Sequence, residues 1–190
     1  MPLSSSRKRL QGSGSLSPRS LEPRKNLKDL GVFHVLYGLR PLPLYGVPYV
    51  SRDLVFAVKT EKSEIREIKE YFSAHGFEPM PLSRGELMLL DLQNNREIKL
   101  IFKPGPLEWD DQVVDRSFEK RNVRILSVED YVVSLLSEKS GAMMLELSAK
   151  TIYANMNEID RDYLEDKASK VSVKNTLDEL IAGLESASRR

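Results

Sequence analysis

The residues with the clearest capacity for chemistry lie in the segment GVPYVSRDLVFAV, residues 46–58. Asp53 leads directly into a short apolar run, and carboxylates are the side chains that bind divalent metal ions such as Mg²⁺. Val55 stands two residues further on, where side chains point to the same face of a strand and a second carboxylate would complete such a site. The segment therefore has the approach to a metal site but lacks the second ligand.

Composition narrows the remaining chemistry. Cysteine is absent from the 190 residues, and histidine occurs only at His34 and His75. These counts exclude disulfides, thiolate metal sites, a cysteine nucleophile and a histidine-rich metal cluster. Chemistry must depend on carboxylates, lysine, arginine, hydroxyl groups or the backbone. Because we find neither a membrane span nor a secretory signal, we expect a cytoplasmic location and no membrane partner.

The charge is unevenly distributed along the chain. Residues 1–28 hold seven Lys or Arg against Glu22 alone, a net charge of +6, which leaves −5 for the remainder of a chain whose net charge is +1. Residues 1–26 are also rich in Ser, Gly and Pro and have few large apolar side chains, so we expect a disordered basic tail. Such an arm is either a solvated terminus or a contact to nucleic acid, because Lys and Arg on phosphates release counterions.

Alternating strand and helix signals begin near residue 27. The run DLVFAVKT, residues 53–60, predicts a buried strand, and the apolar spacing in residues 62–77 predicts a helix that ends at Gly76. Residues 86–92 and 97–102 predict two antiparallel strands joined by an asparagine-containing turn.

The second half of the chain changes to helical patterns. A short strand is expected at 122–126, and Ser127 with Asp130 has the form of a capping box at the start of a helix. Further helices are expected at 143–155, 160–170 and 175–188. We therefore predict an α/β (α+β) fold with a small mixed sheet flanked by helices. Its expected parts are a tail (1–26), an α/β core (27–126) and a helical C-terminal region (127–190).

Several segments in this order resemble the nucleotidyltransferase superfamily, in particular the small archaeal and bacterial members related to the AbiEii toxins. Tyr37-Gly38 stands near the glycine pair of that family, and GVPYVSRDLV is similar to its linker, with Asp53 in the place of the first aspartate. The later matches are REIKLIF (96–102), SVEDYVVSLL (127–136) and IDRDYLEDKA (159–168).

The resemblance implies a two-metal site in which three carboxylates hold two divalent ions about 3.5–4 Å apart. In this chain the second carboxylate position is Val55 and the third is Lys99, so only Asp53 is retained. The implied nucleotide-binding residues are Gly38 and Ser51. Pro41 and Pro43 interrupt the helix that should support the glycine.

Two hypotheses follow for the altered site. In the first, Lys99 takes the place of the metal ion and pairs with Asp53. The alternative to this first hypothesis is that the aliphatic part of Lys99 packs along apolar neighbours while its ammonium group stays in water. In the second, Glu97, which lies on the same strand face as Lys99, shares a Mg²⁺ ion with Asp53. Asp91 on the partner strand is a weaker candidate.

These observations indicate a catalytically degenerate nucleotidyltransferase-like protein that acts as a binding or assembly component, with no cofactor. The expected partner is nucleic acid or a ribonucleoprotein, bound through residues 1–28. One alternative is a Mg²⁺-dependent nucleotidyltransferase with a rearranged site, and another is a subunit that docks on a protein through its C-terminal helices. The expected nucleic-acid contacts are Arg7, Lys8, Arg9, Arg19, Arg24 and Lys25.

Overall fold

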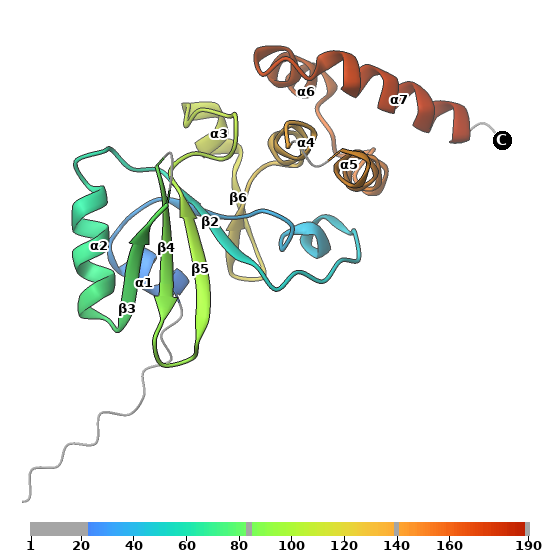
Figure 1. Ribbon diagram of the computed structural model, residues 1–190. Helices are drawn as coiled ribbons and strands as arrows, with labels where there is room; N and C mark the ends of the chain where they lie inside the picture. Colours follow the sequence, from blue (N-terminus) through green and yellow to red (C-terminus); the bar gives the residue numbers. More distant parts are fainter. Residues whose placement is uncertain (1–22, 83–84, 139–140, 189–190) are drawn as a thin grey trace, which may run out of the picture.

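A mixed five-stranded sheet forms the centre of the first half of the chain (Figure 1). The computed structural model describes residues 23–82, 85–138 and 141–188. The strand order is β1-β2-β5-β4-β3, with β2 and β5 parallel and the other neighbours antiparallel. The predicted strand at 53–60 and the predicted hairpin are confirmed. The strands are β1 (His34–Tyr37), β2 (Leu54–Val58), β3 (Phe77–Pro81), β4 (Glu86–Asp91) and β5 (Arg96–Ile101).

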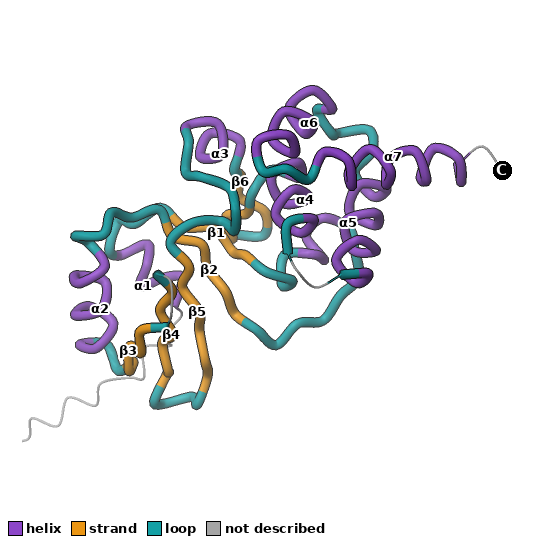
Figure 2. Tube along the Cα trace, turned by 45° about the horizontal axis from the view of Figure 1, so that its top comes forward, coloured by secondary structure: helices purple, strands orange, loops and turns teal. Residues whose placement is uncertain are grey.

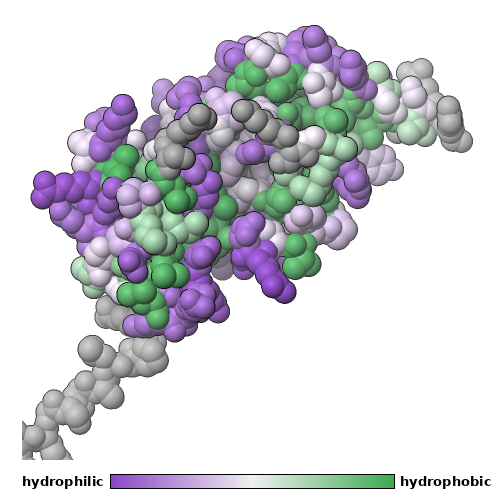
Figure 3. Space-filling view, viewed as in Figure 1, coloured by the Kyte–Doolittle hydropathy of each residue, from purple (hydrophilic) through white to green (hydrophobic). Residues whose placement is uncertain are grey.

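The two faces of the sheet differ in burial. On β4 and β5, Leu87, Leu89, Ile98 and Leu100 alternate with less buried residues, and they share one hydrophobic core with Leu27, Ile68 and Phe72 of the helices α1 (Pro23–Asp29) and α2 (Ile65–Ala74). The opposite face carries both hydrophobic and hydrophilic side chains (Figure 3). The strand period of two therefore separates a core face from a more open face. Gly76 ends α2 with a φ of 86°, as predicted.

The N-terminal boundary differs from the prediction. We expected the disordered tail to reach residue 26, but α1 begins at Pro23, and both Asn26 and Leu27 are buried. The burial of Leu27 in the sheet core explains why these residues form a helix. Residues 1–22 lie outside the described residues.

A second, two-stranded sheet lies beside β1. It consists of β6 (Phe118–Lys120) and β7 (Val123–Ile125), which pair antiparallel across a turn at Arg121 and Asn122. Both turn residues have positive φ, 51° and 62°, which fits the type I′ turn of a two-residue hairpin. The predicted strand at 122–126 is confirmed, and its partner β6, which follows α3 (Asp111–Arg116), is an additional strand.

Four helices follow β7 in the described part of the chain, and Figures 1 and 2 both place them together, away from α2. Ser127 Oγ accepts a hydrogen bond of 3.1 Å from the N–H of Asp130, which confirms the predicted cap. Among the described helices, none combines the length and hydropathy that a membrane span requires. The four are α4 (Val128–Leu136), α5 (Ala142–Ala154), α6 (Arg161–Lys170) and α7 (Lys174–Ser188).

Helix α4 joins the helical part to the sheet. Tyr131 and Leu135 belong to the core of the sheet, whereas Val132 and Val133 pack in a second core with α6 and α7. Tyr131 also stacks on Tyr45 with ring centroids 4.3 Å apart. Tyr45 lies in the single 3₁₀ turn η1 (Leu42–Tyr45), which is the short, proline-interrupted element expected after Gly38.

Candidate functional site

An open pocket of about 580 Å³ lies on the less buried face of the sheet, where β1, β2, β4 and β5 meet. Its lining includes Gly38 after β1, Val55 on β2 and Lys99 on β5. These are the three positions that the sequence resemblance aligns with the glycine pair and with the second and third carboxylates. The fold therefore brings together residues that are up to 61 positions apart in the sequence.

Val55 and Lys99 are direct neighbours in this pocket. They are partners in the parallel register of β2 and β5, so their side chains leave the sheet at the same level. Lys99 Nζ lies 2.8 Å from Glu86 Oε2, and both side chains are about one third exposed, at 35% and 34%. An ammonium group already paired with a carboxylate therefore stands beside an isopropyl group.

The partner of Lys99 corrects the prediction. Asp53 lies just ahead of β2, is exposed, and its N–H donates to Ser51 Oγ at 3.2 Å. Among the described residues, the ion pair of Lys99 is with Glu86, and none joins Lys99 to Asp53. Asp53 is two residues, about 6–7 Å, before Val55 along the strand, whereas Glu86 reaches Lys99 from the adjacent antiparallel strand β4.

The other two carboxylate candidates do not join this site. Glu97 is exposed at the start of β5, opposite Leu90, and does not line the pocket. Asp91 is 2% exposed, and its carboxylate accepts hydrogen bonds from the N–H groups of Gln93 and Asn94 and from the Asn94 amide. Asp91 therefore stabilises the hairpin turn.

The residues present do not fit the two-metal centre that the resemblance implies. Within residues 23–82, 85–138 and 141–188, no group of three or more His, Asp or Glu side chains is arranged to hold a metal ion. The pocket offers the carboxylates of Glu86 and Glu138 against the ammonium groups of Lys62, Lys99 and Lys103. Valine has no ligand atom, and the ammonium of Lys99 repels a divalent cation at the third position.

Gly38 has a backbone role in this pocket. Its φ is 72°, a conformation that costs other residues about 1–2 kcal/mol. Its carbonyl accepts a hydrogen bond of 2.8 Å from the Tyr131 hydroxyl, and a Cβ at this position would lie 3.5 Å from Val55 Cγ2. The backbone at Gly38 is thus held by α4; its role in nucleotide binding, like that of Ser51, stays a prediction.

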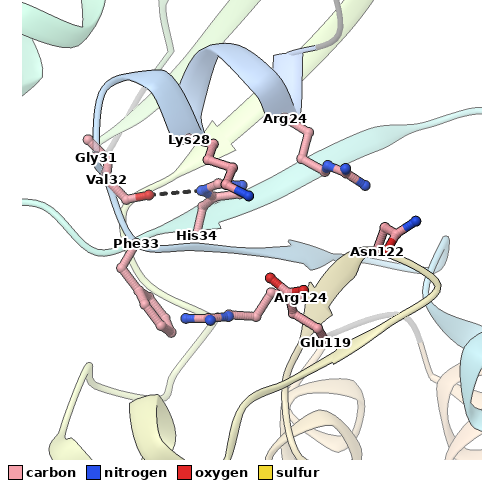
Figure 4. A pocket seen from close by; sticks show the side chains of 9 residues that line it. All are labelled: Arg24, Lys28, Gly31, Val32, Phe33, His34, Glu119, Asn122 and Arg124. Carbon is pink, nitrogen blue, oxygen red and sulfur yellow. Dashed lines mark hydrogen bonds between the residues drawn. The ribbon is translucent and has the colours of Figure 1, made fainter.

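A second pocket, of about 390 Å³, gathers basic side chains between α1, β1 and the β6–β7 hairpin (Figure 4). Arg24, one of the residues expected to contact nucleic acid, lines it together with Lys28, whereas Lys25 is exposed outside it. Sequence reasoning missed two further members, His34 and Arg124. Their sequence separation leaves no local signal, and only the contact between β1 and β7 brings them together. The expected contacts Arg7, Lys8, Arg9 and Arg19 lie outside the described residues.

The fold that these strands and helices form is nucleotidyltransferase-like, on the evidence of a similar solved structure. The chain is similar to the solution structure of the antibiotic-resistance factor ANT(2″)-Ia, an aminoglycoside nucleotidyltransferase. The TM-score is 0.51 and the sequence identity 11%, over 87% of this chain and 92% of that chain. At this identity the likeness shows the fold alone. No protein-family model and no curated protein matches the sequence.

Proposed function

We propose that the protein is a nucleotidyltransferase-fold binding or assembly component that has no transferase activity and that contacts nucleic acid or a ribonucleoprotein through residues 1–28. The observation that carries the loss of activity is the Lys99–Glu86 ion pair beside Val55. It stands where the resemblance to AbiEii-like nucleotidyltransferases requires two carboxylates. The proposed relation to the AbiEii-like members is supported by the order of the sequence motifs.

Electrostatics supports a site without metal chemistry. Lys99 and Glu86 neutralise each other at 2.8 Å, so Glu86 is not available as an unpaired ligand. At about one third exposure such a pair contributes about 0–1 kcal/mol, because water screens it and two long side chains are ordered. The main consequence of the pair is therefore that the ammonium group of Lys99 occupies the position where the resemblance implies a metal ion.

The contact to nucleic acid is supported by the charge distribution. Residues 1–28 have a net charge of +6 and the remainder of the chain −5. A basic segment attached to an acidic body binds a polyanion mainly through its own Lys and Arg, and the released counterions make the affinity salt-dependent. Arg24, Lys25 and Lys28 extend this basic segment into α1.

The activity test is nucleotide transfer. The purified full chain is incubated with labelled nucleoside triphosphate and Mg²⁺, with protein and RNA as acceptors, beside an active nucleotidyltransferase as positive control. We expect no transfer from the wild type and none from Asp53→Ala. Mg²⁺-dependent transfer that Asp53→Ala abolishes would overturn the proposal in favour of an enzyme with a rearranged site.

The binding test is salt-dependent affinity for single-stranded and duplex oligonucleotides. We expect affinity to fall steeply with salt, and to weaken in a variant that lacks residues 1–22. If the wild type binds no nucleic acid, but a protein partner remains associated after nuclease treatment, the nucleic-acid proposal is wrong. In that case docking through α4–α7 takes its place.

A further inference from the structure

The basic pocket is enclosed by three separate elements. Figure 4 shows Arg24 and Lys28 reaching from α1 on one side, while Arg124 and Asn122 come from the β6–β7 hairpin on the other. His34 of β1 lies between them. Arg24 and Lys28 are four residues apart, so they project from the same side of the helix. The pocket, of about 390 Å³, is in the size range of small-ligand sites.

The cationic side chains of the pocket form no ion pair with a described residue, although Glu119 is the register partner of Arg124. Among the ion pairs of the described residues, none includes Arg24, Lys28 or Arg124. Glu119 is the acidic member of the lining, so three permanent cations face one carboxylate. Like charges held around one concave space repel each other, and an anion between them relieves that repulsion.

Arg124 is held in position before any ligand binds. Its guanidinium lies 4.9 Å from the centre of the Phe33 ring, a cation–π contact. Phe33 in turn packs edge-on against Trp109 at 5.6 Å, and the Trp109 indole N–H contacts the carbonyls of Val58 and Phe102, both at 3.1 Å. A guanidinium fixed in this way loses less entropy when it binds an anion.

Two neutral groups add hydrogen-bonding capacity. His34 Nδ1 donates to the carbonyl of Val32 at 2.8 Å, so Nε2 of the neutral ring is an acceptor, and it donates to a phosphate oxygen only when the ring is protonated. Asn122 occupies a left-handed turn position, with a φ of 62°, at the tip of the hairpin. Guanidinium, ammonium, imidazole and amide groups around one space are the groups that bind phosphate oxygens.

We propose that this pocket binds a phosphate group of single-stranded nucleic acid. The proposal rests on the proposed function, whose nucleic-acid contact it extends to a defined site in the folded part of the chain. A pocket of about 390 Å³ takes one nucleotide unit of a flexible strand. A concave pocket does not suit a duplex, because a duplex is bound by a protruding helix or β-ribbon that enters its groove.

The test measures the affinity of the full chain for fluorescein-labelled oligouridylate of about 20 nucleotides, as a function of salt. The pocket variant is Arg24→Ala/Lys28→Ala, because both side chains lie on the surface side of α1 and the buried Asn26 and Leu27 are unchanged. Arg124→Ala is the second variant. The matched controls are Arg96→Ala, an exposed arginine at the start of β5 outside the pocket, and the deletion of residues 1–22.

We expect the double variant to lose about fivefold in affinity at 0.1 M salt, since the pocket binds one phosphate and each neutralised phosphate on a single strand contributes a salt slope of about 0.7. Its log–log salt slope should decrease by about 0.7. Arg124→Ala should lose about fivefold, Arg96→Ala less than about twofold, and the pocket variants should weaken binding of the tail-deleted protein as well.

Three results would overturn the proposal. If the wild type binds the oligonucleotide while both pocket variants keep its affinity and salt slope, the contact lies elsewhere and only the site is wrong. If no nucleic acid binds to the wild type, the proposed function itself fails. If inorganic phosphate or a nucleoside monophosphate binds in an Arg24- and Lys28-dependent way while oligonucleotides do not, the pocket holds a small phosphate ligand instead.

Discussion

The ammonium of Lys99 lies 2.8 Å from the carboxylate of Glu86, next to Val55 on the parallel strand β2. The ammonium group of Lys99 is therefore an internal cation beside the parallel pair of strands β2 and β5 in a nucleotidyltransferase-like sheet. Val55 and Lys99 are register partners, and adjacent strands are about 4.8 Å apart, so carboxylates at both positions would face one metal ion. Carboxylates introduced at Val55 and Lys99 would therefore share one site, and this can be tested by substitution.

The double substitution Val55→Asp/Lys99→Asp should create Mg²⁺-dependent stability. Without metal, the added carboxylates and Glu86 repel each other and the protein is less stable than the wild type. With 10 mM Mg²⁺ and a dissociation constant of about 1 mM, the stability should rise by about 1.4 kcal/mol. Thermal unfolding with and without Mg²⁺ measures this, and Lys99→Met is the control.

Lys99→Met should lower the free energy of unfolding by less than about 1 kcal/mol, because the pair that it removes is one third exposed. Neither this variant nor the wild type should gain stability from Mg²⁺. A Mg²⁺-dependent increase in the wild type of the size expected for the double variant would mean that the metal site has survived.

For the ion pair between Lys167 and Asp110, we expect substitution of Asp110 to lower the stability of the protein more than substitution of Lys167. The Lys167 side chain is 2% exposed and its Nζ lies 2.5 Å from Asp110 Oδ2, whereas the Asp110 side chain is 45% exposed. Asp110→Asn leaves a buried ammonium without its counter-charge and should cost about 1–3 kcal/mol. Lys167→Met removes the buried charge and leaves a solvated aspartate, so it should cost less than about 1 kcal/mol.

The design of these variants separates charge from helix capping. Asp110 also caps α3 by accepting from the Val113 N–H at 2.7 Å, and asparagine is an equally good N-cap, so Asp110→Asn retains the cap. Urea unfolding at pH 7 gives both values. Equal losses, or a larger loss for Lys167→Met, would contradict the argument.

Acid should diminish the contribution of this pair. Burial alone would raise the pKa of Asp110, but the hydrogen bonds from Lys167 and Val113 and the charges of Lys167 and Lys170 lower its pKa overall. A carboxyl with a lowered pKa stabilises the fold above its unfolded value, about 3.8, and this stabilisation is lost as pH falls through the folded pKa. The stability difference between wild type and Lys167→Met should therefore decrease below about pH 3.8.

The sequence predicted the centre of the sheet better than its edges. Strands β2, β4 and β5 are interior strands with apolar or alternating patterns, and all three were found. The edge strands β1 and β3 were missed; β3 contains Pro79 and Pro81, and proline, which removes ladder hydrogen bonds, is tolerated only at an edge. The edge strand is thus the element whose local sequence conflicts most with its structure.

The candidate site was predicted in its positions but not in its pairing. The period of two put Asp53 and Val55 on one face of their strand, and the family resemblance put Lys99 on a neighbouring strand; the structure makes Val55 and Lys99 register partners. The choice of Glu86 over Asp53 as the partner of Lys99 depends on where β2 begins and on the register of β4, which the pattern does not contain. The proximity of Arg24 to Arg124 likewise depends on tertiary contacts.

Gly38→Ala should destabilise the protein by about 1–2 kcal/mol through the backbone alone. The positive φ of 72° is unfavourable for alanine, whereas the added methyl carbon would be at an ordinary contact distance, 3.5 Å, from Val55. Tyr131→Phe, which removes the 2.8 Å hydrogen bond to the Gly38 carbonyl, should cost about 1 kcal/mol.

The two substitutions at Gly38 and Tyr131 should be non-additive, because they act on the same backbone segment. Chemical denaturation of the two single variants and the double variant measures the coupling. A Gly38→Ala protein as stable as the wild type would show that the segment relaxes without cost.

The affinity of the basic pocket for an oligonucleotide should increase as pH falls. Burial, together with the charges of Arg124 and Arg24, lowers the pKa of His34, while its bond to Val32 and the charge of Glu119 act in the opposite direction. A phosphate in the pocket adds negative charge and raises the pKa of His34 in the complex. The complex therefore takes up a proton that the ligand-free protein does not.

The sign of the effect follows from this linkage. As pH falls from the pKa of His34 in the complex to its lowered pKa in the free protein, affinity should rise by about tenfold for each unit of difference between the two. His34 is the lining side chain whose ordinary pKa lies near neutral pH, so it is the group to substitute. His34→Gln should flatten the profile while keeping the salt slope. A profile that is unchanged in His34→Gln would assign the proton uptake to another group.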